Sequence, residues 1–313
     1  MSAALARIVR HRWLVPLVAL VVVSIAFSIA APATFPRFET LATMLRQTVV
    51  VGILAVGMTF VVLTGGIDLS VGSAVAFTTV VIALALRGHA GAAAASLAGI
   101  LAATAAGAAQ GALVARARIA PFIATLFGMT VLRGAAKGLA KEQKIDVDAA
   151  GIDGLLSAGS LFAPGVWILL AISAAAAVVL HRTRFGRHVI AVGSSEATSR
   201  LAGIDVARVR VLVYALSGCL AGVAGVMEFG TLTLGDPTDS VGLELSVIAA
   251  VVVGGTALSG GEGGVLGSLV GALLMTVIRT GANHTGIPNW VQEILTGFII
   301  VGAAMGERPG RRS

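Results

Sequence analysis

The sequence is poor in charged residues, which occupy only 12% of its 313 positions. Soluble globular domains carry about twice that share. Hydrophobic residues make up 57% of the chain, and the mean hydropathy is +0.97. A chain with so few charges cannot cover itself with a water-soluble surface. The composition therefore excludes an ordinary soluble domain and indicates an integral membrane protein.

The sequence also lacks the residue patterns of most enzymes. One cysteine, Cys219, excludes an intramolecular disulfide and a cysteine-clustered metal site. The five histidines show no metal-ligand spacing, and no serine lies in a nucleophile elbow. The glycine-rich stretch GGTALSGGEGGVLGS, residues 254–268, lacks the lysine and the following serine or threonine of a phosphate-binding loop. We therefore expect no catalytic site, no metal and no cofactor on this chain.

What the chain has instead is a succession of apolar runs. Each approaches or reaches the ~20 residues that cross a bilayer as a helix. The runs cover residues 13–31, 41–63, 71–86, 90–115, 119–139, 165–180, 209–232, 243–253, 265–278 and 291–305. The prediction is an all-α integral membrane protein, a polytopic bundle of about ten transmembrane helices that forms a single domain over residues 1–313.

The basic residues indicate how this bundle is oriented. They gather in four places: Arg7, Arg10 and Arg12; Arg116 and Arg118; the segment 182–210; and Arg308, Arg311 and Arg312. By the positive-inside rule all four places belong to the cytoplasm, and an even number of spans separates each from the next. We expect a multi-pass membrane protein with both termini cytoplasmic. Because topology accounts for the basic residues, nucleic acid is not an expected partner.

Small residues spaced four apart recur in several of the apolar runs. Gly218 and Gly222 form one such pair, and Gly267 and Gly271 form another. In lipid this spacing lets two helix backbones approach closely, so we expect these glycines to lie at tight helix contacts.

One carboxylate, Asp68, lies between two apolar runs in the stretch LTGGIDLSVGS, residues 63–73. Gly65 and Gly66 can end one helix, and Asp68 or Ser70 can cap the next one near the cytoplasmic side. A charged residue within a span is a candidate for function by default, so a role in a gate or a pathway is the alternative. The sequence leaves both interpretations open.

The longest polar segment, residues 181–210, contains a helix signal of its own. Ser194 or Ser195 can cap a short helix that begins near Glu196 and stops at Gly203. Such a helix between two spans is a suitable surface for a cytoplasmic partner. The alternative is a basic loop that lies on anionic lipid headgroups.

Four stretches of the chain together resemble one known family. They cover residues 44–77 (MLRQTVVVGILAVGMTFVVLTGGIDLSVGSAVAF), 121–134, 185–204 and 242–274, and a weaker match covers 288–300. In the same order, these stretches resemble the ribose-type permeases of bacterial ABC importers, the membrane subunits for monosaccharides and related small polyols. The resemblance extends over nearly the whole chain.

The resemblance implies a transport subunit embedded in lipid that works as a dimer, either with a second copy or with a paralogous permease. It also implies partner subunits that bind ATP and Mg²⁺ and hydrolyse the ATP, and a periplasmic or extracellular solute-binding protein. The segment 182–208 is then the cytoplasmic coupling loop. Its expected contacts with the ATPase are Glu196, Arg200, Leu201 and Gly203.

The family also implies sugar import by alternating access. A neutral sugar needs hydroxyl, amide and aromatic contacts, and the candidates at membrane depth are Gln47, Thr59, Gln110, Phe122 and Trp290. A non-sugar solute, such as a nucleoside, a branched-chain amino acid or a furanosyl signalling molecule, is one alternative. An ion-coupled secondary transporter is less favoured, because the spans offer few ionisable groups beyond Asp68. A membrane scaffold or receptor without transport activity is the third alternative.

Overall fold

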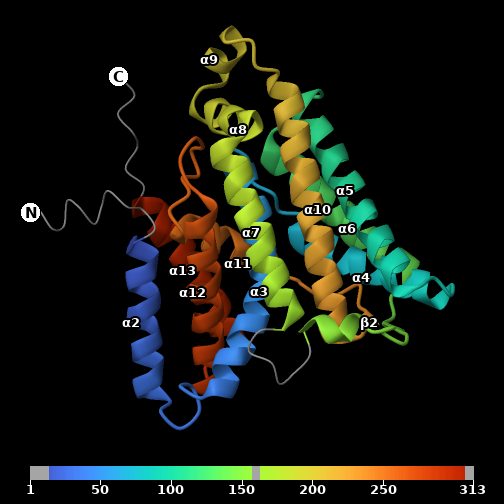
Figure 1. Ribbon diagram of the computed structural model, residues 1–313, viewed down its shortest axis with the longest axis vertical. Coiled ribbons are helices and arrows are strands. Elements are labelled where there is room, and N and C mark those ends of the chain that lie inside the picture. Colours follow the sequence, from blue (N-terminus) through green and yellow to red (C-terminus); the bar gives the residue numbers. More distant parts are fainter. Residues whose placement is uncertain (1–13, 157–162, 307–313) are drawn as a thin grey trace, which may run out of the picture.

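The computed structural model of the protein describes residues 14–156 and 163–306, in which nearly all regular structure is helical (Figure 1). The apolar helices are α2 (Leu14–Ala30), α3 (Phe38–Leu63), α4 (Val71–Arg87), α5 (Ala92–Ala115), α6 (Pro121–Leu139), α7 (Pro164–Arg182), α10 (Val206–Leu232), α11 (Leu243–Val253), α12 (Val265–His284) and α13 (Asn289–Gly306). Between α7 and α10 lie two short helices, α8 (Arg184–Ser194) and α9 (Glu196–Leu201). A 3-10 helix, η1 (Ile152–Leu156), and the antiparallel strands β1 (Ile145–Asp146) and β2 (Leu234–Gly235) complete the described part.

Every predicted apolar run forms a helix, so the all-α membrane-protein prediction is confirmed. Six of these helices, α3, α5, α6, α7, α10 and α12, are long and apolar enough to cross a membrane. The other four are shorter, and α11 has only 11 residues. A helix of that length rises about 16 Å, roughly half of the hydrocarbon core of a bilayer. The count of about ten crossings therefore stays a prediction.

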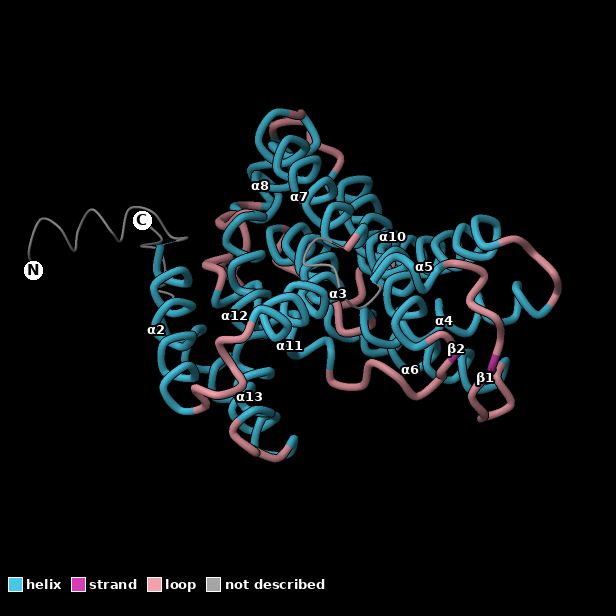
Figure 2. The backbone as a smooth tube through the Cα atoms, turned by 60° about the horizontal axis from the view of Figure 1, so that its bottom comes forward, coloured by secondary structure: helices cyan, strands magenta, loops and turns pink. Residues whose placement is uncertain are grey.

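Helix α3 lies at the centre of the bundle and packs against α7, α10, α11 and α12 (Figure 2). Two hydrogen bonds show that α12 runs antiparallel to it. Thr59 Oγ1 donates to Ser268 Oγ over 2.7 Å, and Thr280 Oγ1 donates to Gln47 Oε1 over 3.2 Å. Helices α5 and α10 form a second antiparallel pair beside this core.

The glycine pairs predicted to bring helices together do so. A Cβ on Gly218 would collide with the carbonyl oxygen of Ala103, and one on Gly222 would lie 2.6 Å from the Cα of Ile100, both in α5. On α12, a Cβ on Gly271 would meet the carbonyl oxygen of Ala250 in α11. Larger side chains would hold these helices apart, and the close backbones gain dispersion energy. The prediction from the glycine spacing is therefore confirmed.

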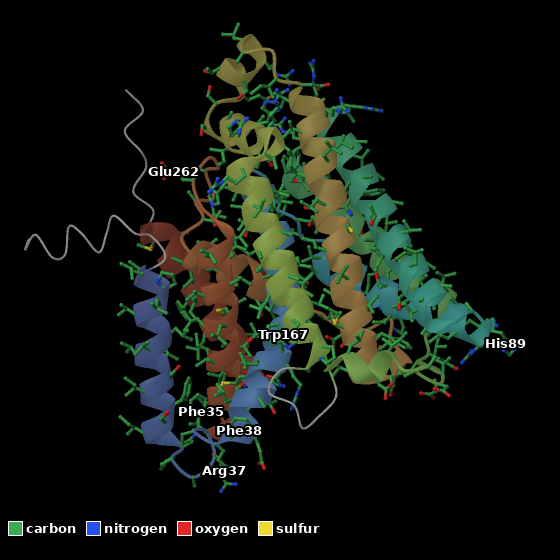
Figure 3. All side chains as sticks on the ribbon, viewed as in Figure 1. Phe35, Arg37, Phe38, His89, Trp167 and Glu262 are labelled. Atoms are coloured by element: carbon green, nitrogen blue, oxygen red, sulfur yellow. The ribbon has the colours of Figure 1, made fainter. Side chains whose placement is uncertain are left out.

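The two ends of the bundle differ in their residues (Figure 3). At one end lie α8, α9 and the loop that carries Glu262, and we call this the α8–α9 end. Toward the other end lie β1, β2 and aromatic residues that include Phe35, Phe38 and Trp167. Trp167 is 58% exposed at that end, and tryptophans are enriched where a membrane meets water.

The described chain begins and ends toward the α8–α9 end, at the start of α2 and the end of α13 (Figure 1). This arrangement agrees with an even number of crossings. The terminal arginines used for the orientation, Arg7, Arg10, Arg12, Arg308, Arg311 and Arg312, lie outside the described residues. The cytoplasmic position of the termini stays a prediction.

The contact between α11 and α12 gives a first test. Gly271→Ala places a methyl group against the carbonyl oxygen of Ala250, and the helices must separate. We expect a loss of about 1–3 kcal/mol in stability, measured as a lower unfolding temperature in detergent. Gly302→Ala in α13 is the control, because its Cβ meets nothing within 4 Å. Equal unfolding temperatures for the two variants would contradict this packing.

Candidate functional site

The turn between α3 and α4, residues 64–70, is held by backbone hydrogen bonds and by one glycine. Helix α3 ends at Leu63, where the N–H groups of Thr64 and Gly66 both donate to Val61 O and that of Gly65 donates to Val62 O. Gly65 has a φ of 75°, which a residue with a Cβ seldom adopts. The glycine thus ends α3 as the sequence predicts, and the chain turns back into the bundle.

Asp68 is the hub of this turn. Its Oδ1 accepts hydrogen bonds from Ser70 N over 2.9 Å and from Ser70 Oγ over 2.7 Å. Its Oδ2 accepts a hydrogen bond from Ser217 Oγ over 2.8 Å. The residue is only 2% exposed, so a carboxylate that lacked these donors would carry a large desolvation cost. The three hydrogen bonds fix the turn to α10.

The geometry agrees with the capping interpretation of the turn only in part. Ser70 is the N-cap residue of α4, but its side chain makes no capping hydrogen bond and donates to Asp68 instead. Within the described part of the chain Asp68 accepts from Ser70, including its backbone N–H, and from Ser217, but from no N–H inside α4. The choice between a cap and a gate stays a prediction. The depth also differs from the expectation. Ser217 lies near the middle of α10, so Asp68 lies inside the bundle, whereas the end of α3 lies nearer the α8–α9 end.

Two further helices enclose the same turn. Thr125 Oγ1 of α6 donates to Ile67 O over 3.0 Å. From α10 the hydroxyl of Tyr214 approaches Gly66 so closely that a Cβ there would lie 2.6 Å from it. That hydroxyl is buried and has no hydrogen-bond partner in the described part of the chain. Thr64, Gly66, Asp68 and Ser70 of the turn are therefore buried by protein, whereas Gly65 is exposed and Ile67 and Leu69 are partly buried.

A second interrupted helix meets this site. The segment 236–242 follows β2 and leads to α11, which begins at Leu243. A Cβ on Gly72, in the first turn of α4, would lie 2.5 Å from both Ser240 O and Glu244 Oε2. The N-termini of α4 and α11 therefore lie side by side; that of α4 is buried, and that of α11 is at the surface, where Val241 is 76% exposed and Leu245 is 48% exposed. Short, discontinuous helices that meet in this way often form the solute pathway of transporters.

The segment 236–242 is fixed at the β1–β2 end. Arg133 Nη1 of α6 donates to Pro237 O over 3.0 Å and to Asp239 O over 2.6 Å. Lys144 lies before β1 and forms an ion pair with Asp236 over 3.0 Å. The backbone N–H and the hydroxyl of Thr238 also donate to Asp236 Oδ1, over 2.8 Å and 2.7 Å. These contacts keep the approach to α11 in one conformation.

At the α8–α9 end, three segments that are distant in sequence meet. Gly261 N donates to Leu63 O over 2.9 Å, which joins the loop 254–264 to the end of α3. A Cβ on Gly193, near the end of α8, would collide with the same carbonyl oxygen and with Gly261 N. Only a glycine allows this approach. The end of α8 therefore rests directly on the residue that precedes the Asp68 turn.

Helix α9 matches its prediction from the sequence. Ser195 is its N-cap, and the side chain accepts from Thr198 N over 3.3 Å, whereas Gly203 follows the helix with a φ of 78°. Glu196 accepts from Arg200 over 2.7 Å and from Arg210 over 2.5 Å. The Arg200 hydrogen bond is the largest of the effects that lower the pKa of Glu196.

Leu201 is the last residue of α9, and its side chain is 91% exposed. Beside it α8 and α9 enclose a shallow groove of about 250 Å³, lined by small residues that include Ser194, Thr198 and Ala202. Sequence reasoning predicted α9 but not α8, whose residues 184–194 form a separate amphipathic helix.

The five residues chosen as pathway candidates do not form one cluster. Thr59 is fully buried between α3 and α12, and Gln110 is buried against Gly128, with Oε1 unpaired in the described residues. Gln47 lies 12 positions before Thr59 on α3, about 18 Å away along the helix. Phe122 and Trp290 are more than half exposed on α6 and α13. Their role in a pathway stays a prediction.

The partners of Asp68 were not predicted from the sequence. Ser217 and Tyr214 belong to a long apolar helix and show no motif, and Arg133 lies in a span without any nearby acidic residue in sequence. Only the packing of α6 and α10 brings these side chains to the interrupted helices.

Comparison of the sequence with known proteins finds a matching family model and several relatives. The family model described as "Branched-chain amino acid transport system / permease component" matches residues 40–304. The chain is 40% identical to the ribose import permease protein RbsC of Escherichia coli (strain K12) over 92% of this chain and 91% of the relative. It is 35% identical to that of Bacillus subtilis (strain 168) over 94% and 92%. It is 34% identical to the L-arabinose ABC transporter permease protein AraH of Azospirillum brasilense over 87% and 81%. No solved structure matches the chain significantly.

The Asp68 turn gives a second test. Asp68→Ala leaves the donors of Ser70 and Ser217 unpaired in a buried site, and we expect a loss of about 2–4 kcal/mol in stability, measured by unfolding in detergent. Asp205→Ala, which removes the exposed N-cap side chain of α10, is the control with an expected loss of about 1 kcal/mol. A loss at Asp68 no larger than that at Asp205 would refute the role of the carboxylate as a hub.

Proposed function

The chain belongs to the branched-chain amino acid transport system / permease component family, and we propose that it imports a monosaccharide or a related small polyol. It is a permease subunit of an ABC transporter, and it does not itself carry out catalysis. The observation that carries the proposal is the match to ribose permeases over more than nine-tenths of both chains.

The sugar is favoured over other solutes by the names of the relatives. Permeases for ribose and L-arabinose match at 34–40% identity, whereas the branched-chain amino acid appears only in the description of the family. A nucleoside, a branched-chain amino acid or a furanosyl signalling molecule is the alternative solute. Purified transporter with its binding protein, tested for uptake of radiolabelled ribose, arabinose and leucine, would distinguish these.

ATP is bound and hydrolysed, in this proposal, by two partner ATPase subunits at the α8–α9 end, which faces the cytoplasm. The basic residues of 182–210 lie at this end, as the positive-inside rule requires. The chain then crosses the inner membrane about ten times with both termini cytoplasmic, and α11 together with the segment 236–242 makes one of the crossings. A solute-binding protein docks at the β1–β2 end.

The coupling route follows from contacts that begin at α9. A partner that contacts Leu201 and the neighbouring groove moves α9 and α8 as a pair. Gly193 of α8 rests on Leu63 O, and Gly261 N bonds to the same oxygen. Displacement of α8 thus reaches the end of α3 and, through residues 64–70, the Asp68 hub. ATP can bias the permease only if the two states of the ATPase contact α9 differently.

The solute pathway is proposed to lie where α4 and α11 begin, between this chain and a second permease copy. The helix N-termini and the Ser240 carbonyl offer hydrogen-bonding groups to sugar hydroxyls at this depth. Phe122 and Trp290 expose aromatic faces on α6, which packs against α4, and on α13, which packs against α11. Gln47, Thr59 and Gln110 are the further pathway candidates in this proposal.

Uptake into proteoliposomes separates this proposal from an ion-coupled transporter. We expect uptake only when the ATPase, ATP and the binding protein are all present, and we expect a protonophore to have no effect. The control is a vesicle with an ATPase that cannot hydrolyse ATP. Uptake that continues without the ATPase and stops with the protonophore would refute the ABC mechanism.

The coupling surface gives a third test. Leu201→Ser removes an apolar side chain that contacts almost nothing within the chain, so folding should be unchanged and ATPase binding should weaken at least tenfold. Binding-protein-stimulated ATP hydrolysis would fall with it. Ala117→Ser, at an exposed position after α5 and outside the α8–α9 groove, is the control.

Two further substitutions act on α9 itself. Arg200→Glu places a second carboxylate beside Glu196, and Gly203→Pro cannot adopt the φ of 78° that ends the helix. Each should leave the protein inserted but separate ATP hydrolysis from uptake. Normal coupling in both would show that α9 is not the contact with the ATPase.

A further inference from the structure

An apolar cleft of about 470 Å³ lies between α7 and α10, outside the site described above. Its walls are Ala175 and Val179 of α7 and Leu212 and Leu216 of α10, and Phe60 of α3 forms its floor. Phe185 of α8 lies at its end, with its ring 6.3 Å from that of Phe60. Every residue that lines the cleft is apolar.

The cleft opens to the outside of the bundle near the α8–α9 end. Leu212 is 46% exposed, and Ala175 is also exposed. Val179 lies three residues before the end of α7, and Leu212 lies in the second turn of α10. In a bilayer the cleft therefore belongs to the leaflet next to α8 and α9. Lipid acyl chains, rather than water, are the available filling for an apolar space at that depth.

Basic residues surround the end of the cleft. Arg182 ends α7, Arg184 begins α8, and Arg208 lies one helical turn before Leu212 on α10. All three are exposed, and their side chains make no ion pair or hydrogen bond within the described part of the chain. They lie at the height of lipid headgroups, directly beyond the apolar walls.

The acidic groups near this rim are already engaged. Helices α7 and α8 contain no aspartate or glutamate. Glu196 is paired with Arg200 and Arg210, and Asp205 accepts a hydrogen bond from the backbone N–H of Arg208. The three arginines thus form a positive rim over an apolar cleft, which complements an anionic headgroup joined to an acyl chain.

Helices α7 and α8, which line part of the cleft, lie on the side of the molecule away from α6 and α13 (Figure 2). The junction of α4 and α11, where the solute pathway is proposed, is on the side of α6 and α13. A second permease copy that shares this pathway leaves α7 and α10 in contact with lipid.

We propose that this cleft binds one acyl chain of an anionic phospholipid, whose phosphate is held by Arg182, Arg184 and Arg208. The lipid would lie against Phe185 at the start of α8, the helix whose other end rests on Leu63. Bound in this way, an anionic lipid holds α8 against the bundle and so supports the coupling route. This inference requires only that the chain spans a membrane, and it is independent of the identity of the solute.

The headgroup contact is tested by charge removal. The purified permease in non-ionic detergent is titrated with dioleoylphosphatidylglycerol and, separately, with dioleoylphosphatidylcholine, and native mass spectrometry measures Kd for the first bound lipid. We expect tighter binding of the anionic lipid. The double variant Arg182→Gln and Arg208→Gln should raise its Kd about tenfold. Arg116→Gln with Arg118→Gln, which removes the same charge from exposed positions after α5, is the control.

The acyl-chain contact is tested by filling the cleft. Ala175→Trp places an indole in the space, and we expect Kd to rise at least tenfold for both lipids. Ala174→Trp is the matched control, since Ala174 is also exposed but does not line the cleft. The exposed arginine variants keep the proposal testable if the larger side chain at 175 prevents folding.

Three results would overturn the proposal. The first is an equal Kd for the anionic and the zwitterionic lipid. The second is a charge variant that cannot be distinguished from the Arg116 and Arg118 control. The third is a change in oligomeric mass for Ala175→Trp without a change in lipid binding, which would assign the cleft to an interface between two copies.

Discussion

The carboxylate of Asp68 holds together the part of the structure on which the rest depends. Three hydrogen bonds, two from Ser70 and one from Ser217, connect the turn after α3 to the middle of α10. An interrupted helix in a membrane leaves polar backbone groups that lipid cannot satisfy. Here the turn satisfies them with its own side chains and with Thr125 of α6. The bundle can therefore bury the N-terminus of α4 in its interior, with that of α11 beside it at the surface.

The same turn lies at one end of a continuous line of contacts. Leu63 precedes it, and the carbonyl oxygen of Leu63 touches both Gly193 of α8 and Gly261 of the loop before α12. No flexible side chain intervenes, so displacement of α8 is passed from backbone to backbone. The apolar cleft with its arginine rim, filled by lipid, and the exposed helix α9 would then both act on α8.

Several features followed from local patterns of residues. The apolar runs gave all ten apolar helices, because each run needs only its own hydrogen bonds to be stable in lipid. Ser195 and Gly203 gave the limits of α9, since capping and a positive φ depend on the residues at the helix ends. The spacing of Gly218 and Gly222 gave a close helix contact, although not the identity of the opposing helix, α5.

The sequence by itself determined that this is an all-α membrane protein, which family it resembles and where the short helix α9 begins and ends. It did not determine the depth of Asp68 in the bundle, its hydrogen bond with Ser217, or the contact between the N-termini of α4 and α11. Residues 68 and 217 lie 149 positions apart, and no local pattern encodes such a pairing. Only the tertiary structure decided these features, because the burial of a polar turn requires donors from whichever helices pack beside it.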